Sequence, residues 1–136
     1  MRVNTHTFRL RPGQELRSSI EAYCREECLR SVSIVTCVAG VKDLSLRMAG
    51  ATPQKQDVRQ FKGDYEVVSL VGTLANFKSH LHISVSDKAG VVFGGHLKEA
   101  TVVWTAEITI LEDSQTEFSR QYDPETGFDE LVVKTT

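Results

Sequence analysis

Regular alternation of apolar and polar side chains is the feature that most constrains the fold of this chain. Residues 101–111, with the sequence TVVWTAEITIL, show it most clearly. Successive side chains of a β-strand point to opposite faces, so the pattern predicts a strand with one apolar and one polar face. The predicted apolar face carries Val102, Trp104, Ala106, Ile108 and Ile110, and the polar face carries Thr101, Thr105, Glu107 and Thr109.

Most of the remaining chain also has strand character. Segments that alternate or are rich in β-branched residues predict strands at 3–10, 31–48, 65–74, 80–86 and 130–135. Gly40 is expected to mark a bulge or bend in the second of these. Residues 49–64 combine glycine, proline and charge, and we interpret them as a loop or a weak edge strand.

One helix is predicted at residues 14–30, directly after Pro12 and Gly13. Its apolar residues recur at helical spacing and form one stripe: Leu16, Ile20, Tyr23, Cys24 and Cys28. We interpret Cys24 and Cys28 as small buried residues rather than ligands. One helix packed against a mostly antiparallel sheet is the α+β class, and we expect a single compact domain over residues 1–136.

The composition argues against several classes of protein. The chain has 16 Lys and Arg against 18 Asp and Glu, a net charge of −2, so it lacks the basic excess typical of nucleic-acid-binding proteins. It has no apolar run of about 18 residues, which a membrane-spanning helix would need, and no secretory signal at its start. The three cysteines form no paired motif and indicate reduced thiols. We therefore expect a cytoplasmic or nuclear protein that is not secreted.

Three of the four histidines lie within residues 80–97, HLHISVSDKAGVVFGGHL. His80 and His82 are two positions apart, so on a strand their side chains share one face. Leu81 then takes the opposite face, toward the core. His6 lies apart in the sequence, and we interpret it as a surface residue of a strand.

The turn after this pair determines where the third histidine lies. Gly90 suits the left-handed position of a hairpin loop formed by residues 88–90. In that register His96 lies directly opposite His82 and on the same face. A two-residue loop would place His96 on the other face, and a bulge at the two glycines before it would also change the register.

Three convergent imidazoles would favour a borderline metal such as Zn²⁺, with the fourth coordination position open as in catalytic zinc sites. The glycines before His96 would let backbone come close to whatever binds there. The alternative is that the histidines are solvated residues of an exposed strand and share only a stretch of sequence.

Four segments together resemble the PPC (plant and prokaryote conserved) domain. They are GDYEVVSLVGTL at 63–74, HLHISVSDKAGVVFGGHL at 80–97, EATVVWTAEITI at 99–110 and FSRQYDPETGFDELV at 118–132. The resemblance extends from about Val3 to Val133. It implies a compact α+β fold that assembles as a homotrimer. For members that keep all three histidines it also implies a bound metal, with zinc expected, and the ligands would be His80, His82 and His96.

Plant members of the family carry a separate AT-hook that enters the minor groove of DNA, and this chain has no such segment. We therefore expect no direct DNA binding by this chain alone. A Gly-Arg-Phe-Glu-Ile-Leu motif is implicated in partner binding by plant members, and here residues 63–68 read GDYEVV. Gly63 and Glu66 match and are candidate partner-binding residues, whereas the change to Asp64 argues against the same partners. Alternatively, Glu66 is a plain exposed or interface residue.

The PPC fold is also similar to that of acetolactate decarboxylase, which implies that such a scaffold can host zinc chemistry. A catalytic site would need a proton donor or an anion clamp near the metal. The candidates are Glu99, Glu107, Arg47 and Lys98, and each is alternatively an ordinary surface residue.

Three classes of function fit these residues, and whether the chain is an enzyme stays open among them. The first is a metal-binding homotrimer whose three-histidine site takes an unknown small ligand or substrate. The second is a DNA-associated or protein-interaction regulatory module. The third is a trimer in which the zinc is purely structural. The histidines favour the first or the third class, and we rank the first highest.

Overall fold

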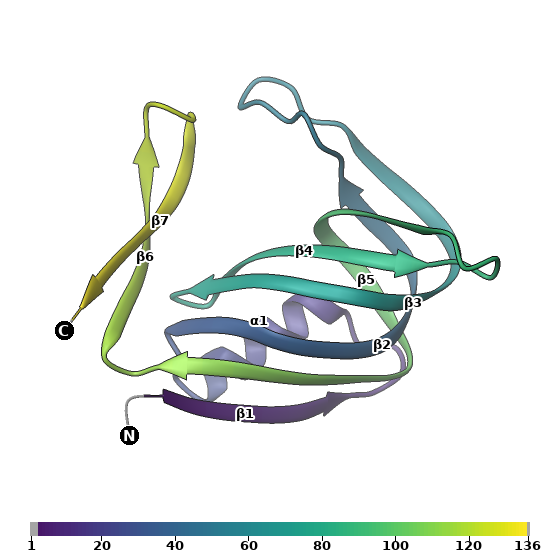
Figure 1. The fold of residues 1–136 in the computed structure, drawn as a ribbon, viewed down its shortest axis with the longest axis horizontal. Helices are drawn as coiled ribbons and strands as arrows, with labels where there is room; N and C mark the ends of the chain where they lie inside the picture. Colours follow the sequence, from purple (N-terminus) through teal and green to yellow (C-terminus); the bar gives the residue numbers. More distant parts are fainter. Residues whose placement is uncertain (1–2, 136) are drawn as a thin grey trace.

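The computed structural model describes residues 3–135 and divides them into strands and one helix. In chain order these are β1 (Val3–Leu10), α1 (Leu16–Glu26), β2 (Ser31–Arg47), β3 (Val58–Ala75), β4 (Lys78–Ser86), β5 (Val92–Asp113), β6 (Thr116–Asp123) and β7 (Phe128–Thr135). The pairings among them are antiparallel. The predicted α+β class with one main helix is therefore confirmed (Figure 1). Within the described part of the chain, no helix is long and apolar enough to cross a membrane.

The length of β5 gives the main sheet its shape. The strand order is β1-β5-β2-β3-β4, and residues 92–96 of β5 also pair with β4. The strands β2 to β5 thus close on themselves like a small barrel. Residues 106–113 at the other end of β5 pair with β1 on one side, and residues 106–112 also pair with β2 on the other. Figure 1 shows β5 in green, curling from the region of β4 to the lower edge beside β1.

The core lies between α1 and the sheet. Leu16, Ile20 and Cys24 are the buried residues of α1. Inward-facing strand residues fill the remaining space, among them Val41, Leu46, Leu81, Leu97 and Ile108. Leu81 and Leu97 are the sequence neighbours of the three histidines. The alternation that buries these leucines therefore directs the imidazoles to the outer surface.

Two glutamates hold α1 against the strands that carry the histidines. The carboxylate of Glu15 accepts hydrogen bonds from two N–H groups of the first helical turn, at 2.7 and 3.0 Å, which is the role of an N-cap. It also accepts one from the N–H of Ala100 on β5, at 2.9 Å. Glu21 accepts two from the N–H and hydroxyl of Ser79, at 3.0 and 2.6 Å, directly before His80 on β4.

The prediction for the end of the helix was wrong. Cys28 lies beyond α1, is exposed, and has a φ of 57°. The N–H groups of Cys28 and Leu29 donate to the carbonyls of Arg25 and Cys24, at 3.2 and 2.8 Å. This Schellman arrangement ends the helix and turns Cys28 outward. Cys24 is buried, as predicted, and burial followed by the charge of Glu21 raises the pKa of its thiol to about 11.

β5 departs from the predicted alternation at Trp104. The register with β2 shifts between Ala39, which pairs with Ala106, and Gly40, which pairs with Val103. This bulge gives Trp104 a φ of 66° and leaves it 78% exposed, so its predicted place on the buried face was wrong. The predicted irregularity at Gly40 is confirmed. A Cβ there would lie 2.8 Å from the carbonyl oxygen of Val103, closer than any other residue tolerates.

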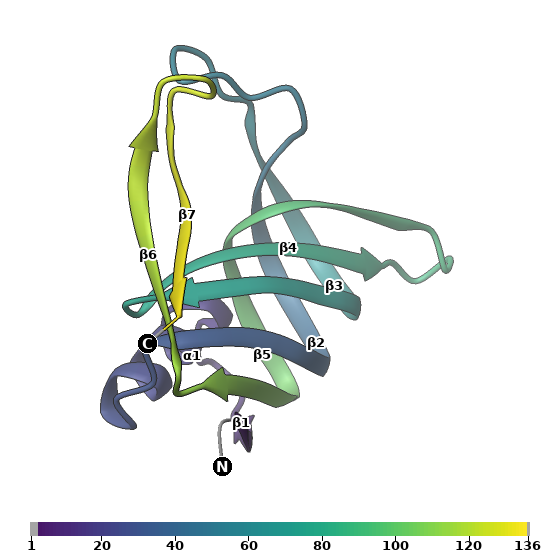
Figure 2. The same ribbon diagram turned by 60° about the vertical axis from the view of Figure 1, so that its left-hand side comes forward.

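A second, two-stranded sheet stands beside the main one. β6 and β7 pair only with each other, and Figures 1 and 2 show this hairpin in yellow-green and yellow. β7 extends the strand predicted at 130–135, but β6 was not predicted. None of the side chains of β6 is fully buried, so its sequence carries little alternation. The segment 49–64 is part loop and part strand, because β3 already begins at Val58.

Candidate metal centre

The hairpin of β4 and β5 has the predicted register. The N–H of Asp87 donates to the carbonyl of Val91 at 3.0 Å, and the N–H of Gly90 donates to the carbonyl of Asp87 at 3.0 Å. Gly90 has a φ of 80°, the left-handed conformation that the three-residue loop requires. His82 consequently pairs with His96, and the ladder runs without a bulge from this pair to the loop.

The three imidazoles meet on the outer face of the hairpin. The ring centroid of His80 lies 5.2 Å from the centroid of His82 and 5.2 Å from that of His96. The centroids of His82 and His96 are 5.6 Å apart. One ring nitrogen from each histidine lies within 4.8 Å of the others. A tetrahedral zinc with bonds of about 2.0–2.1 Å holds its nitrogens roughly 3.4 Å apart, so small ring rotations would bring these atoms to binding distance.

Burial and positive charge favour the neutral form of two of these rings. His80 and His96 are half-buried, whereas His82 is exposed. Burial, followed by the charge of Arg47, lowers the pKa of His96 to about 4. Burial, followed by the charge of Arg120, also lowers the pKa of His80. Neutral imidazole is the form that binds a metal, so neither ring has to lose a proton at neutral pH.

Gly94 and Gly95 allow β5 to pack closely between its two neighbours just before His96. A Cβ at Gly94 would overlap the carbonyl oxygen of Ile83 on β4, and a Cβ at Gly95 would lie 2.9 Å from the carbonyl oxygen of Arg47 on β2. These close contacts bring the histidine-bearing strands together. Both glycines also line the pocket beside His82 and His96, so the sequence-based prediction that backbone comes close to a group bound there stays a prediction.

Arg47 is the candidate from the sequence that lies closest to the histidines. It pairs with His96 across β2 and β5, and its Nη2 is 3.4 Å from Nδ1 of His96, a long contact. Its guanidinium carbon lies 5.8 Å from the centre of the Phe128 ring on β7. Arg47 also lines a pocket of about 520 Å³ together with His82, His96 and residues 48–51.

The remaining candidates differ in their relation to the histidines. Beyond the effect of burial, the charge of Lys98 contributes to the low pKa of His96. Glu99 is exposed, and within the described residues it is not among the charges that act on His96. Glu107 pairs with Val38 near the middle of β2, away from the end of that strand that adjoins the histidines.

Two charged residues of the β6–β7 hairpin, which the sequence did not predict as part of the site, act on His80. The pKa of His80 is lowered first by burial and then by the positive charge of Arg120, while the carboxylate of Glu130 acts in the opposite direction. Nη2 of Arg120 donates to Oγ1 of Thr73 at 3.3 Å, and Thr73 pairs with His80 across β3 and β4. In the sequence, only the family resemblance marks the segment FSRQYD at residues 118–123. No periodicity links it to the histidines.

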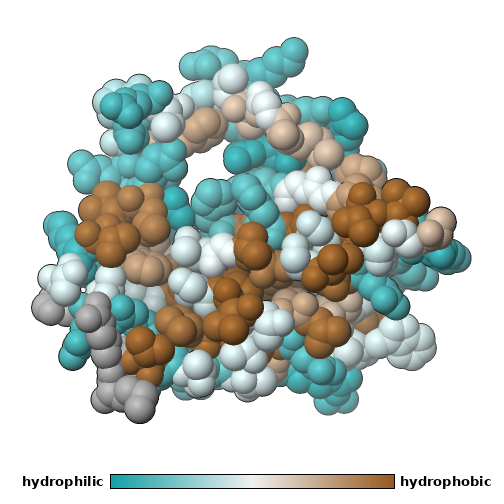
Figure 3. Space-filling view, viewed as in Figure 1, coloured by the Kyte–Doolittle hydropathy of each residue, from teal (hydrophilic) through white to brown (hydrophobic). Residues whose placement is uncertain are grey.

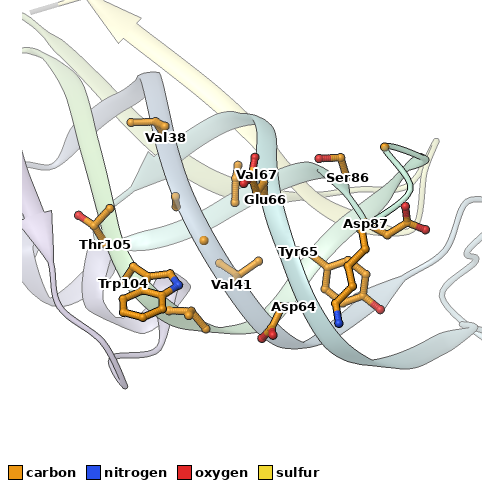
Figure 4. A pocket seen from close by; sticks show the side chains of 15 residues that line it. Val38, Val41, Asp64, Tyr65, Glu66, Val67, Ser86, Asp87, Trp104 and Thr105 are labelled. Atoms are coloured by element: carbon orange, nitrogen blue, oxygen red, sulfur yellow. The ribbon is translucent and has the colours of Figure 1, made fainter.

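Gly63 and Glu66 lie elsewhere in the structure. Glu66 lines a second pocket, of about 680 Å³, whose walls include Tyr65 and Trp104 (Figure 4). None of the three histidines lines this pocket. Gly63 is exposed with a φ of 108°, and Glu66 is exposed as well. Exposure at both positions fits partner-binding residues and equally fits ordinary surface residues, so their role in partner binding stays a prediction.

The sequence model of the Plants and Prokaryotes Conserved (PCC) domain matches residues 2–114 of this chain. A curated relative is the bifunctional protein GlmU of Synechococcus sp. (strain JA-3-3Ab). It is 32% identical over 133 residues, and the match covers 97% of this chain and 21% of that protein. The chain thus spans about a fifth of the length of the curated relatives it matches.

Solved structures share the fold over nearly the whole chain. A hypothetical protein from Salmonella enterica is 37% identical, with a TM-score of 0.91 and coverage of 98% of this chain and 94% of its own. A PPC protein from Pyrococcus horikoshii is 28% identical, with a TM-score of 0.83 and coverage of 93% and 91%. A metal-containing protein from Archaeoglobus fulgidus is 23% identical, with a TM-score of 0.83 and coverage of 95% and 93%, a likeness of fold.

The matched region includes β1 to β5 and all three histidines, and the β6–β7 hairpin follows it. The chain belongs to the Plants and Prokaryotes Conserved (PCC) domain family.

Proposed function

We propose that this protein binds zinc through His80, His82 and His96, and that the metal in turn binds a small ligand or substrate. The observation that carries the proposal is the convergence of three imidazole nitrogens within 4.8 Å on one outer face. Three neutral nitrogen donors suit a borderline metal such as Zn²⁺. The fold shared with a metal-containing protein from Archaeoglobus fulgidus also supports a metal-binding role.

The geometry favours a ligand-binding metal over a closed structural one. Three protein ligands leave the fourth position of a tetrahedral site open, as in catalytic zinc centres. The pocket of about 520 Å³ beside His82 and His96 has room for a small molecule next to that position. Zinc bound here would supply a Lewis acid that polarises an oxygen of the ligand. The chain itself positions the imidazoles through the β4–β5 hairpin and places Arg47 at the pocket wall.

The proposal includes assembly as a homotrimer. Large apolar side chains are exposed on the strands of the main sheet: Val35 and Val38 on β2, Val68 and Val71 on β3, and Trp104 on β5. Figure 3 shows apolar side chains gathered across the face of the sheet turned to the viewer. Exposed apolar patches are typical of protein interfaces. The resemblance to PPC proteins implies the threefold arrangement.

Elemental analysis of the purified protein tests the metal. We expect stoichiometric zinc that a chelator removes and added zinc restores. Thermal melts on the same samples separate the two roles of the metal. A folded, assembled apoprotein supports the ligand-binding role, and loss of the fold with the metal supports the structural one. Protein that holds no metal and takes up none from zinc-containing buffer would contradict the proposal.

A further inference from the structure

Two arginines from separate elements flank the histidine cluster. Arg47 at the end of β2 pairs with His96. Arg120 on β6 bonds to Thr73, the cross-strand partner of His80. The half-buried histidines therefore each have a guanidinium nearby, and the two arginines lie far apart in the sequence. Only the docking of the β6–β7 hairpin beside the barrel brings them to the same site.

Neither guanidinium is neutralised by the protein. Within residues 3–135, neither forms an ion pair with a carboxylate. Arg47 makes the long contact to His96 and a contact with an aromatic ring, and Arg120 donates to a hydroxyl. Glu130 is the one carboxylate among the charges that act on His80. Both arginines are half-buried, and their guanidinium donors that have no partner in the protein stay open to solvent, where an anion can reach them.

The β6–β7 hairpin and the loop between β2 and β3 meet above this part of the surface. The turn between β6 and β7 packs on the loop between β2 and β3, where a Cβ at Gly127 would lie 2.6 Å from Cγ of Pro53. Figure 2 shows the hairpin and the loop rising together above the sheet, and Figure 3 shows the surface hollowed below them. The pocket that Arg47 and His96 share with loop residues 48–51 opens here. A small molecule can therefore enter beside Arg47 and His96.

We infer that the site takes a small oxyanion, a carboxylate or a phosphate, with one oxygen at the open metal position and the others held by Arg47 and Arg120. The inference rests on the metal site proposed above and adds the class of ligand and the role of Arg120. The planar fork of arginine matches the oxygens of both anions. Three neutral imidazole ligands do not offset the +2 charge of a zinc ion. An anion would therefore bind at its open position more strongly than a neutral molecule.

Calorimetric titration of the zinc-loaded protein with malonate, and separately with inorganic phosphate, tests this inference. The variants are Arg47→Gln and Arg120→Gln. The control is Arg59→Gln, since Arg59 is exposed and paired with Asp57 at 2.8 Å, outside the cluster. Each cluster variant should weaken anion binding by about tenfold or more, the worth of a charge-assisted hydrogen bond. The control should bind as the wild type does, and the zinc content should be equal in all four proteins. Tighter binding of malonate identifies a carboxylate ligand, and tighter binding of phosphate identifies a phosphate.

The outcomes separate this inference from the proposed function. The inference is overturned if the protein holds full zinc but binds no anion, or if both cluster variants bind the anion as tightly as the wild type. Either result leaves the metal site standing. Wild-type protein without zinc overturns the proposed function. In that case the same titrations on metal-free protein in chelator test the arginines alone. If the wild type and the arginine variants then bind malonate and phosphate equally well, the inference is overturned too. If a glutamine variant unfolds in thermal melts, Arg47→Lys and Arg120→Lys replace it. These keep the charge but lose the fork, and affinity equal to wild type in both overturns the inference.

Discussion

His82 and His96 lie directly opposite each other on β4 and β5, with their ring centroids 5.6 Å apart. His80 joins them because it is two positions from His82 on the same strand face. A slip of the hairpin by one residue would turn His96 toward the core and Leu97 outward. The cluster therefore depends on the loop that sets the register as much as on the histidines themselves.

Loss of one histidine should nearly abolish metal binding. His82→Ala leaves two imidazoles, which form a poor zinc site, so we expect it to release most of the zinc. The double variant His82→Ala, His96→Ala should lose little more, because residues that act as a unit are not additive. Elemental analysis of the purified variants measures this.

The matched control for this series is His6→Ala. His6 lies on β1, and its Nδ1 is 3.4 Å from the hydroxyl of Tyr23, in a different part of the structure. It should retain full zinc. Full occupancy in His82→Ala would show that the three rings share a location without sharing a metal.

Acid should destabilise the metal-free protein through His96. Burial, then the charge of Arg47, holds its pKa near 4 in the folded state, below the ordinary value of 6.5. Between these values the unfolded chain binds a proton at His96 that the folded chain does not, so the free energy of unfolding falls as pH drops from 6.5 toward 4. In urea melts with EDTA, wild type should lose stability more steeply than His96→Gln over this range. Parallel curves for the two proteins would rule out the low folded-state pKa.

Gly94→Ala should destabilise the hairpin that holds the histidines. The new Cβ would overlap the carbonyl oxygen of Ile83, so β4 and β5 would have to separate. We expect a loss of about 1–3 kcal/mol in the free energy of unfolding, the usual cost of overpacking, together with weaker zinc binding. Ser84→Ala is the control, because Ser84 pairs with Gly94 and the change removes an atom instead of adding one. Denaturant melts in which both variants match wild type would contradict the close packing.

The protein should assemble as a trimer. Light scattering is expected to give about three times the chain mass of 15.2 kDa. Val38→Glu places a charge among the exposed apolar residues of the main sheet and should shift the protein to smaller species. Val133→Glu changes a comparably exposed valine on β7 and should leave the mass unchanged. A wild-type monomer at micromolar concentration would refute the assembly.

Binding to duplex DNA should be weak and should fall with added salt. The net charge of −2 offers little release of counterions, which drives most affinity for DNA. Fluorescence anisotropy with a labelled duplex at physiological salt measures this. Tight, sequence-selective binding by the isolated chain would favour the regulatory class of function instead.

Local patterns in the sequence determined the strands, the helix and the facing of the histidines. A strand period of two separates Leu81 from His80 and His82 without reference to any other part of the chain. The left-handed preference of Gly90 determines the loop, and the loop in turn places His96 opposite His82. These signals act over a few residues, so they can be interpreted from the sequence alone.

Tertiary structure decided the features that depend on neighbours remote in sequence. Trp104 leaves the core because β5 bulges against Gly40 on β2, and the local alternation gives no sign of that partner. The charges of Arg120 and Glu130 act on His80 because the β6–β7 hairpin docks against β2 and β3, although neither of its strands has a fully buried residue. The histidine cluster was thus predictable from local geometry. Its charged surroundings were not, because they come from separate segments that only packing brings together.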